Sequence, residues 1–358
     1  MTAIVRAIVD TAALRHNLER ARALAPGARV LAVIKANAYG HGIVPTAVAL
    51  AGADGFAVAR LEEATALRAA GLRHRVVLLE GVFSSEQLKL AAHHDFDIMV
   101  HEPEQLALLE AQPAARPFRV WFKIDTGMNR LGFKPGQVAA ALARLQACAV
   151  VSKPVTLVTH LASADDRDDS CTGEQIALFE RLTAGVPGER SIANSAGLIG
   201  FPAARAGWVR PGLMLYGVSP FADGTGESLG LRPAMTLSTR VIAVKQVGTG
   251  ERVGYGGTWR AARPTRLAIA AGGYGDGYPR NTAAGTPVLV GGHRATLVGR
   301  VSMDMVAIDV TDVPAVTVGE EVVLWGPGVP VEDVARAAGT IPYELVCGVS
   351  QRVHLDVR

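Results

Sequence analysis

Short apolar runs alternate with helical patterns between about residues 28 and 217. Runs of four to six mostly β-branched or aliphatic residues are typical of buried parallel strands, and the segments between them space apolar residues as an amphipathic helix does. The predicted strands are VLAVIK (30–35), GFAV (55–58), VVLLE (76–80), DIMV (97–100), VWFKID (120–125), VTLVTH (155–160), SIAN (191–194) and LMLY (213–216). The clearest helices are predicted over 60–71, 84–94 and 172–185. About eight such units in fewer than 200 residues predict a TIM-type (β/α)8 barrel.

An additional strand and helix over 4–24 precede the first of these units. The helix is expected to be capped by Asp10 or Thr11, because both side chains can accept a hydrogen bond from a free backbone N–H group at a helix start.

The pattern changes after about residue 220. Alternating strand patterns punctuated by Gly and Pro then predict a C-terminal, mostly antiparallel β domain. They are MTLSTRVIAVKQV, TRLAIAAGG, TPVLVGG, RATLVGRVSMDMVAIDV and EEVVLWG, with one late helix at 331–339. We therefore expect a barrel over 1–222 and a β domain over 223–358, joined near the Gly- and Ser-rich segment 219–230. The first strand, about 1–10, could instead pack with the β domain.

Composition narrows the class of protein. A chain of 358 residues is too long for one ordinary core, and 49% hydrophobic with 19% charged residues is typical of a well-packed soluble protein. The net charge of +3 is scattered, which argues against a nucleic-acid surface. Cys148, Cys171 and Cys347 are far apart and odd in number, so we expect neither disulfides nor a metal site. We expect a cytoplasmic protein without a leader or membrane segment.

The chemistry of such a barrel lies at the C-terminal ends of its strands. Lys35 closes the first predicted strand and is followed by ANAYGHG. From position alone, this lysine could equally extend its ammonium group out of the barrel mouth into water. Tyr39 and the two glycines at 40 and 42 favour a ligand site, because glycine lets the backbone approach a ligand closely.

Other polar residues follow later strands at the same face. Arg130 lies after the fifth strand, His160 ends the sixth, Asn194 and Ser195 follow the seventh, and Arg210-Pro211-Gly212 precede the last predicted strand. Phosphate sites of these barrels use the loops around strands seven and eight, where a serine hydroxyl and glycine N–H groups suit a phosphate. A lysine facing a phosphate site indicates a Schiff-base aldolase or an enzyme of pyridoxal phosphate.

Eight segments in order along the chain together resemble the alanine racemase family. They are AVIKANAYGHG (32–42), KIDTGMNRLG (123–132), ANSAG (193–197), VRPGLMLYG (209–217), VGYGGTW (253–259), GYGDGYPR (273–280), GRVSMD (299–304) and YELVCGVS (343–350). The resemblance covers both predicted domains. It implies an isomerase that interconverts L- and D-alanine with pyridoxal 5'-phosphate, for peptidoglycan precursors or for alanine breakdown.

The resemblance also implies a role for each matching residue. Lys35 would carry the cofactor as a Schiff base, and Tyr255 would be the second acid/base. Substrate carboxylate would be held by Arg130 and the backbone N–H of Met303. The cofactor-binding residues would be Lys35, Tyr39, His160, Asn194, Ser195, Arg210, Gly212 and Tyr343, with Arg210 at the pyridine nitrogen. Lys123 matches a lysine that is often carbamylated and bonded to the arginine at position 130. Asp165, Arg280, Arg300 and Ile341 resemble an entrance corridor.

The reaction itself agrees with this layout. Racemisation removes the Cα proton from one face of the substrate and returns a proton to the other, so two different residues are needed. A tyrosine needs nearby positive charge to act as a base, which His160 and Arg210 could supply. Tyr255 belongs to the β domain and could fold onto its own barrel or a neighbour's. The resemblance implies the neighbour's, in a head-to-tail homodimer with shared sites.

Three other functions remain open at this point. A barrel-type decarboxylase of pyridoxal phosphate is disfavoured, because the carboxylate clamp expected from Arg130 would hold the group that a decarboxylase must release. A serine or broad-specificity racemase is not excluded. A carrier that binds the cofactor without chemistry would leave Tyr255 and Met303 without a role.

Overall fold

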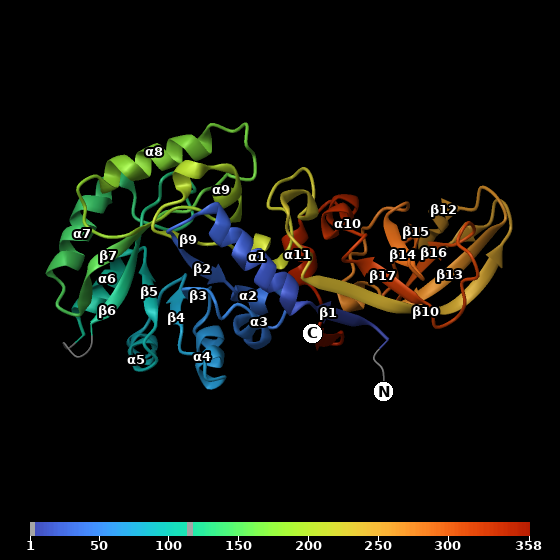
Figure 1. Cartoon of the computed structure of the whole chain (residues 1–358), viewed down its shortest axis with the longest axis horizontal. Helices are drawn as coiled ribbons and strands as arrows, with labels where there is room; N and C mark the ends of the chain where they lie inside the picture. Colours follow the sequence, from blue (N-terminus) through green and yellow to red (C-terminus); the bar gives the residue numbers. More distant parts are fainter. Residues whose placement is uncertain (1–3, 113–116) are drawn as a thin grey trace.

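The computed structural model describes residues 4–112 and 117–358 and shows two domains side by side, a barrel and a β domain (Figure 1). Residues 1–3 of the predicted first strand lie outside the described residues. The barrel strands are parallel and follow the order β8-β7-β6-β5-β4-β3-β2-β9. They are β2 (Arg29–Val33), β3 (Gly55–Val58), β4 (Arg75–Leu78), β5 (Asp97–Val100), β6 (Phe118–Lys123), β7 (Val151–Val158), β8 (Arg190–Ser191) and β9 (Trp208–Val209). The predicted barrel is confirmed.

The two short strands at the ends of this order, β8 and β9, nearly close the barrel. The N–H group of Arg210, just after β9, donates to the carbonyl of Ala193 at 2.9 Å. The Ser191 hydroxyl donates to the Trp208 carbonyl at 2.9 Å. These bonds hold the loops after β8 and β9 together.

Helices cover the outside of the barrel, as the periodic segments predict. They are α1 (Thr11–Leu24), α3 (Ile43–Ala49), α4 (Leu61–Ala69), α5 (Ser85–His93), α6 (Pro103–Glu110), α7 (Val138–Ala147), α8 (Cys171–Thr183) and α9 (Ser195–Gly200). Asp10 is the N-cap of α1, since its carboxylate accepts from the N–H groups of Ala12 and Ala13. No helix among the described residues is long and apolar enough to cross a membrane.

Several predicted strand ends at the barrel mouth are wrong. VVLLE, VWFKID, VTLVTH and SIAN were extended two or three residues too far, since the strands end at Leu78, Lys123, Val158 and Ser191, and His160 therefore follows its strand instead of ending it. LMLY is a 3-10 helix, Leu213–Tyr216, and the last barrel strand is β9, which lies before it. A four-residue apolar run fits either structure, and all four side chains are buried here in a helical turn. Arg210 and Gly212 therefore follow the last strand instead of preceding it. The first strand also ends earlier than predicted, at Val33, so that Lys35 begins a separate short turn, α2 (Lys35–Tyr39).

The β domain is one mostly antiparallel sheet with the strand order β13-β16-β15-β14-β17-β10-β1-β18 and an additional β10–β13 pairing. Its strands are β10 (Met235–Val247), β13 (Thr265–Ala271), β14 (Pro287–Val290), β15 (His293–Val298), β16 (Met305–Asp309), β17 (Glu321–Trp325), β18 (His354–Val357) and, from the chain's start, β1 (Arg6–Val9). The sequence patterns missed β18, the small hairpin β11 (Arg252–Val253) and β12 (Trp259–Arg260), and α11 (Pro342–Cys347), while α10 (Val331–Ala338) was predicted.

Side chains tie the connection between the domains to both of them. The buried Glu332 of α10 accepts from the N–H groups of Ser219 and Gly226, each at 2.8 Å. The buried Asn17 of α1 donates to the carbonyls of Leu215 and Arg232. The segment between barrel and β domain is therefore fixed at both ends.

Candidate active site

A cavity of about 640 Å³ opens at the C-terminal ends of the barrel strands. Its volume is in the range of small-molecule and cofactor sites. Most of the predicted site residues line it: Lys35, Tyr39, Lys123, Arg130, His160, Asn194, Ser195, Arg210, Gly212 and Tyr343. The structure thus brings together residues from six segments that are distant in sequence.

The turn directly after Lys35 has a left-handed helical backbone, which L-amino acids disfavour. Ala36, Asn37, Ala38 and Tyr39 all have φ between 52° and 54°. Left-handed helical backbone costs roughly 1–2 kcal/mol for each such residue, so the surroundings must hold this turn. The Tyr39 ring stacks on that of Tyr216, with centroids 4.8 Å apart. Tyr39 also lines the cavity.

Hydroxyl and N–H groups gather where a phosphate is expected. The Ser195 hydroxyl accepts from the N–H group of Gly212 at 2.9 Å. A Cβ atom on Gly212 would lie only 2.7 Å from the Tyr39 hydroxyl, so glycine is needed for Tyr39 to approach. Asn194 accepts from the N–H of Gly197 and fixes the start of α9. Phosphate oxygens would find two hydroxyls and a glycine N–H group on this side of the cavity.

Arg210 is a buried cation whose partners are all neutral. Its guanidinium donates to the Ser191 hydroxyl at 2.6 Å and the Thr159 carbonyl at 2.7 Å, and it lies 3.4 Å from His160 Nδ1. Burial lowers the pKa of Arg210 to about 10, which leaves it charged at neutral pH. Burial, helped by Arg210 and Lys123, lowers the pKa of His160 well below its usual value. The expectation that His160 supplies positive charge is wrong, because its imidazole is neutral.

Lys123 adds a further buried amine to this wall. Burial, then the neighbouring Arg210 and Arg130, lower its pKa to about 8. Among the described residues, no carboxylate forms an ion pair with Lys35, Lys123, Arg130 or Arg210. A cavity with several cations that are not paired with carboxylates is suited to an anionic ligand.

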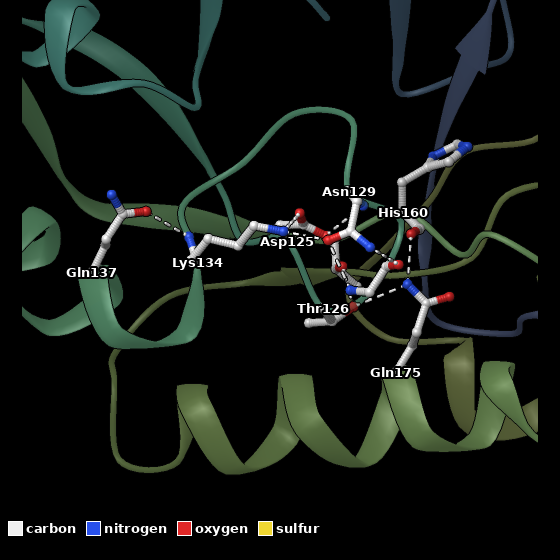
Figure 2. A network of polar contacts seen from close by, with 9 residues as sticks. Asp125, Thr126, Asn129, Lys134, Gln137, His160 and Gln175 are labelled. Carbon is white, nitrogen blue, oxygen red and sulfur yellow. Dashed lines mark hydrogen bonds and ion pairs between the residues drawn. The ribbon is translucent and has the colours of Figure 1, made fainter.

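The loop that carries Arg130 is fixed by a network of polar contacts (Figure 2). Asp125 accepts from the N–H groups of Gly127 and Asn129, each at 3.0 Å, and from the Lys134 ammonium at 2.6 Å. Burial raises the pKa of Asp125, but these donors outweigh it and leave the pKa lowered. The carboxylate therefore stays charged and holds the turn before Arg130.

Gln175 of α8 connects this loop to the next one. Its amide donates to the Thr126 hydroxyl at 3.2 Å and to the His160 carbonyl at 3.1 Å. This role could not be predicted from sequence patterns, because the partners are backbone and side-chain groups of other loops. Glu63 in the first turn of α4 was missed too, although its carboxylate accepts from N–H groups at the start of α4 and of the loop after Lys35, and an acidic residue in a first helical turn is a capping signal.

Two predicted residues are not brought to the cavity by their own chain. Tyr255 and Met303 lie in the β domain and are 66% and 51% exposed. Tyr255 begins a 3-10 turn, Tyr255–Gly257, between β11 and β12. Neither residue lines the barrel cavity.

Comparison with known proteins gives the same result for both domains. Residues 9–220 match the family model "Alanine racemase, N-terminal domain", and residues 234–357 match "Alanine racemase, C-terminal domain". The chain is 54% identical to an alanine racemase of Nitrosococcus oceani over 97% of this chain and 98% of that protein. It is 50% identical to one of Shewanella sediminis, over 97% of each.

Solved structures agree with the sequence relatives. The biosynthetic alanine racemase of Pseudomonas aeruginosa superposes with a TM-score of 0.95 at 46% identity, covering 100% of this chain and 99% of that one. The alanine racemase of Bartonella henselae with covalently bound pyridoxal phosphate superposes with a TM-score of 0.89 at 28% identity, covering 100% of both.

Proposed function

This chain belongs to the alanine racemase family, and from that premise we propose that its barrel cavity holds pyridoxal phosphate on Lys35 and that Tyr255 of a second copy completes the site. The family consists of isomerases that depend on this cofactor, and the chain acts on alanine as its relatives do. The single observation that carries the proposal is that one cavity is lined by Lys35 together with Ser195 and Gly212.

The residues present fit the cofactor. Its phosphate would be held by Tyr39, Ser195, Gly212 and Tyr343, and the Gly212 position is open only because it has no Cβ. His160 and Asn194 would lie around the ring. Arg210 would stand at the ring nitrogen, where it can donate a hydrogen bond but cannot accept one.

Each remaining residue then has a task at the substrate. When bound, pyridoxal phosphate supplies an electron-withdrawing ring that stabilises negative charge at the substrate Cα. The Arg130 guanidinium and the Met303 N–H group of a second copy would bind the substrate carboxylate. The Lys35 amine would move the Cα proton on one face, and the Tyr255 hydroxyl would move it on the other.

Lys123 is the residue that we propose to be carbamylated. Carbon dioxide adds only to a neutral amine, with formation of an N–C bond and release of one proton. A lysine whose pKa is about 8 is neutral in an appreciable fraction near pH 7. The carbamate would place a negative charge among Arg130 and Arg210.

We propose a head-to-tail homodimer because the exposed Tyr255 and Met303 have no role at their own barrel. Inactive Tyr255→Phe protein mixed with inactive Lys35→Ala protein should regain activity, since one of the two sites in a mixed dimer contains both native residues. Differently tagged subunits verify the exchange. Exchange without any recovery would show that both residues act within one chain.

The cofactor assignment is tested directly on the purified protein. Borohydride reduction followed by peptide mapping should find the cofactor on Lys35, and L-alanine should lose its optical rotation. An adduct on a different lysine would refute the assignment, and parallel assays with serine measure specificity. We also propose a cytoplasmic location, because the free thiols of Cys148, Cys171 and Cys347 suit a reducing compartment.

A further inference from the structure

The carboxylate of Glu63 joins two neighbouring loops at the barrel mouth. Glu63 lies in the first turn of α4, and its Oε2 accepts from the N–H groups of Ala59 at 2.9 Å and Arg60 at 3.1 Å. These two bonds satisfy free N–H groups at the start of a helix. Its other oxygen, Oε1, accepts from Ala36 at 2.6 Å and Asn37 at 3.4 Å. The second pair belongs to the loop after β2.

That second pair holds the left-handed turn directly after Lys35. The turn has a disfavoured backbone conformation in four consecutive residues, so its own hydrogen bonds do not suffice to select it. Glu63 fixes its first two N–H groups. The side chain of Asn37 in turn accepts from the N–H group of Ile43 at 2.9 Å and ties the turn to α3. The backbone between Lys35 and Tyr39 is therefore held by side-chain bonds on both sides.

We propose that Glu63 is a positioning residue, whose carboxylate fixes the left-handed turn and thereby the direction in which Lys35 and Tyr39 enter the cavity. This inference rests on the function proposed above for Lys35. Both oxygens are needed as acceptors, because each faces a separate pair of N–H groups. A glutamine would turn its NH2 group toward one pair, either at the helix or at the turn.

The first test is the protection of the turn in the cofactor-free full-length chain. Hydrogen exchange of peptides spanning residues 34–42 is compared in wild type, Glu63→Gln and Glu63→Asp. Glu62→Gln is the matched control, because Glu62 is an exposed acid in the same helical turn. We expect exchange in the turn to rise roughly tenfold or more in Glu63→Gln, as for the loss of a charge-assisted hydrogen bond, and to stay within about twofold in the control.

The second test asks whether the turn controls Lys35. The dissociation constant for pyridoxal phosphate should rise roughly tenfold in Glu63→Gln, and kcat should fall by a larger factor than KM rises. Glu63→Asp is too short to reach the turn but still accepts at the start of α4. Glu63→Asp should therefore lower cofactor affinity and kcat to the same extent, while hydrogen exchange in α4 stays unchanged. This result would separate positioning from folding if Glu63→Gln proves unstable.

Two results would overturn the proposal. One is turn exchange that is the same in Glu63→Gln and Glu62→Gln. The other is faster exchange in the turn with unchanged cofactor affinity and kcat. Failure of the underlying function is distinguishable from both, since wild-type protein would then fail to trap the cofactor on Lys35.

Discussion

The two ends of the barrel differ in whether their cationic side chains are paired with carboxylates. At the N-terminal ends of the strands, the fully buried Asp97 accepts from Arg119 at 2.6 Å and from the Trp121 indole at 2.9 Å, and Arg75 lies 3.4 Å away. The Arg29 guanidinium lies over the Trp208 ring, 4.3 Å from its centroid, and pairs with a glutamate. Each cation named here has a carboxylate partner.

At the C-terminal mouth, four cations that line the cavity form no ion pair with a carboxylate of the described residues: Lys35, Lys123, Arg130 and Arg210. Arg210 is only 5% exposed, yet its guanidinium contacts only neutral groups, and the pKa of Lys123 is lowered partly by the charge of Arg210. A buried charge without a counter-charge costs stability. The described structure therefore pairs the buried Asp97 with arginines at one end, whereas the four cavity cations at the other end can bind an anionic ligand.

The largest effect that separates the two ends is expected from Lys35→Ala. If Lys35 carries the cofactor and moves the proton, its loss should slow racemisation by roughly four orders of magnitude, or about 5 kcal/mol in activation free energy. Unfolding by urea should be almost unchanged, because Lys35 has no ion-pair partner to lose among the described residues. Racemisation within about tenfold of wild type would contradict the assignment.

The reverse is expected at the other end. Asp97→Ala leaves two arginines and an indole N–H group without their acceptor, so the free energy of unfolding should fall by about 3–5 kcal/mol. The activity of each folded molecule should stay near that of wild type. Asp312→Ala is the control, because this 78% exposed acid pairs with Arg263 at the surface and should cost less than about 1 kcal/mol. If both variants lost the same free energy of unfolding, the buried Asp97 would contribute no more to stability than a surface ion pair.

The third prediction is a pH-dependent gain in stability at the mouth. The pKa of Lys123 is about 8 in the folded chain against an ordinary 10.5, so the native state disfavours the proton. The cost is complete below pH 8, decreases between about pH 8 and 10.5, and is absent above. Lys123→Met should therefore stabilise the cofactor-free protein by on the order of 3 kcal/mol at pH 7, with a gain that shrinks as pH rises.

Bicarbonate-free buffer is required for that measurement, because a carbamate would replace the positive charge by a negative one. The exposed Lys89→Met is the control and should show no such pH dependence. A gain that grows with pH would refute the assigned direction of the pKa shift.

The strands that could be predicted most accurately are those with the simplest environment. GFAV and DIMV match β3 and β5 residue for residue, because every side chain in them is buried and the flanking residues end the run. LMLY was wrong because its burial arises from packing in a 3-10 turn, which four apolar letters do not distinguish from a strand. The terminal strand β18 was missed because its pairing with β1 joins opposite ends of the chain.

The candidate site likewise contains residues that could be predicted from the sequence and residues that could not. Lys35, Ser195 and Gly212 could be predicted to line the cavity because they follow strands of a recognisable barrel within four residues. Glu63 and Gln175 could not, since they bind backbone groups of loops that only the fold brings near. For Tyr255, even the complete fold of one chain is insufficient to test the role that we propose, because that role requires a second copy.

The smallest expected effect is on cofactor affinity in Gly212→Ala, which tests whether the space beside Tyr39 is needed for the cofactor. In Gly212→Ala the new Cβ would lie 2.7 Å from the Tyr39 hydroxyl, so the tyrosine must move. We expect cofactor affinity to fall by roughly tenfold, or about 1.4 kcal/mol. Gly173→Ala in α8 is the control, because a Cβ there meets no atom within 4 Å and alanine favours a helix.

A second variant shows whether that clash is the cause. Tyr39→Phe removes the hydroxyl that Gly212→Ala would strike, so the two changes in one chain should cost less stability than the sum of the single changes. Urea unfolding of the four proteins measures this coupling. Strictly additive changes in the free energy of unfolding would mean that the new Cβ does not clash with the Tyr39 hydroxyl. Gly212 would then be required only for its backbone. At the N-terminal ends of the strands, by contrast, Arg119 and Trp121 are coupled because both donate to the carboxylate of Asp97. Residues there are coupled through a charge, whereas Gly212 and Tyr39 at the mouth are coupled through close contact of uncharged atoms.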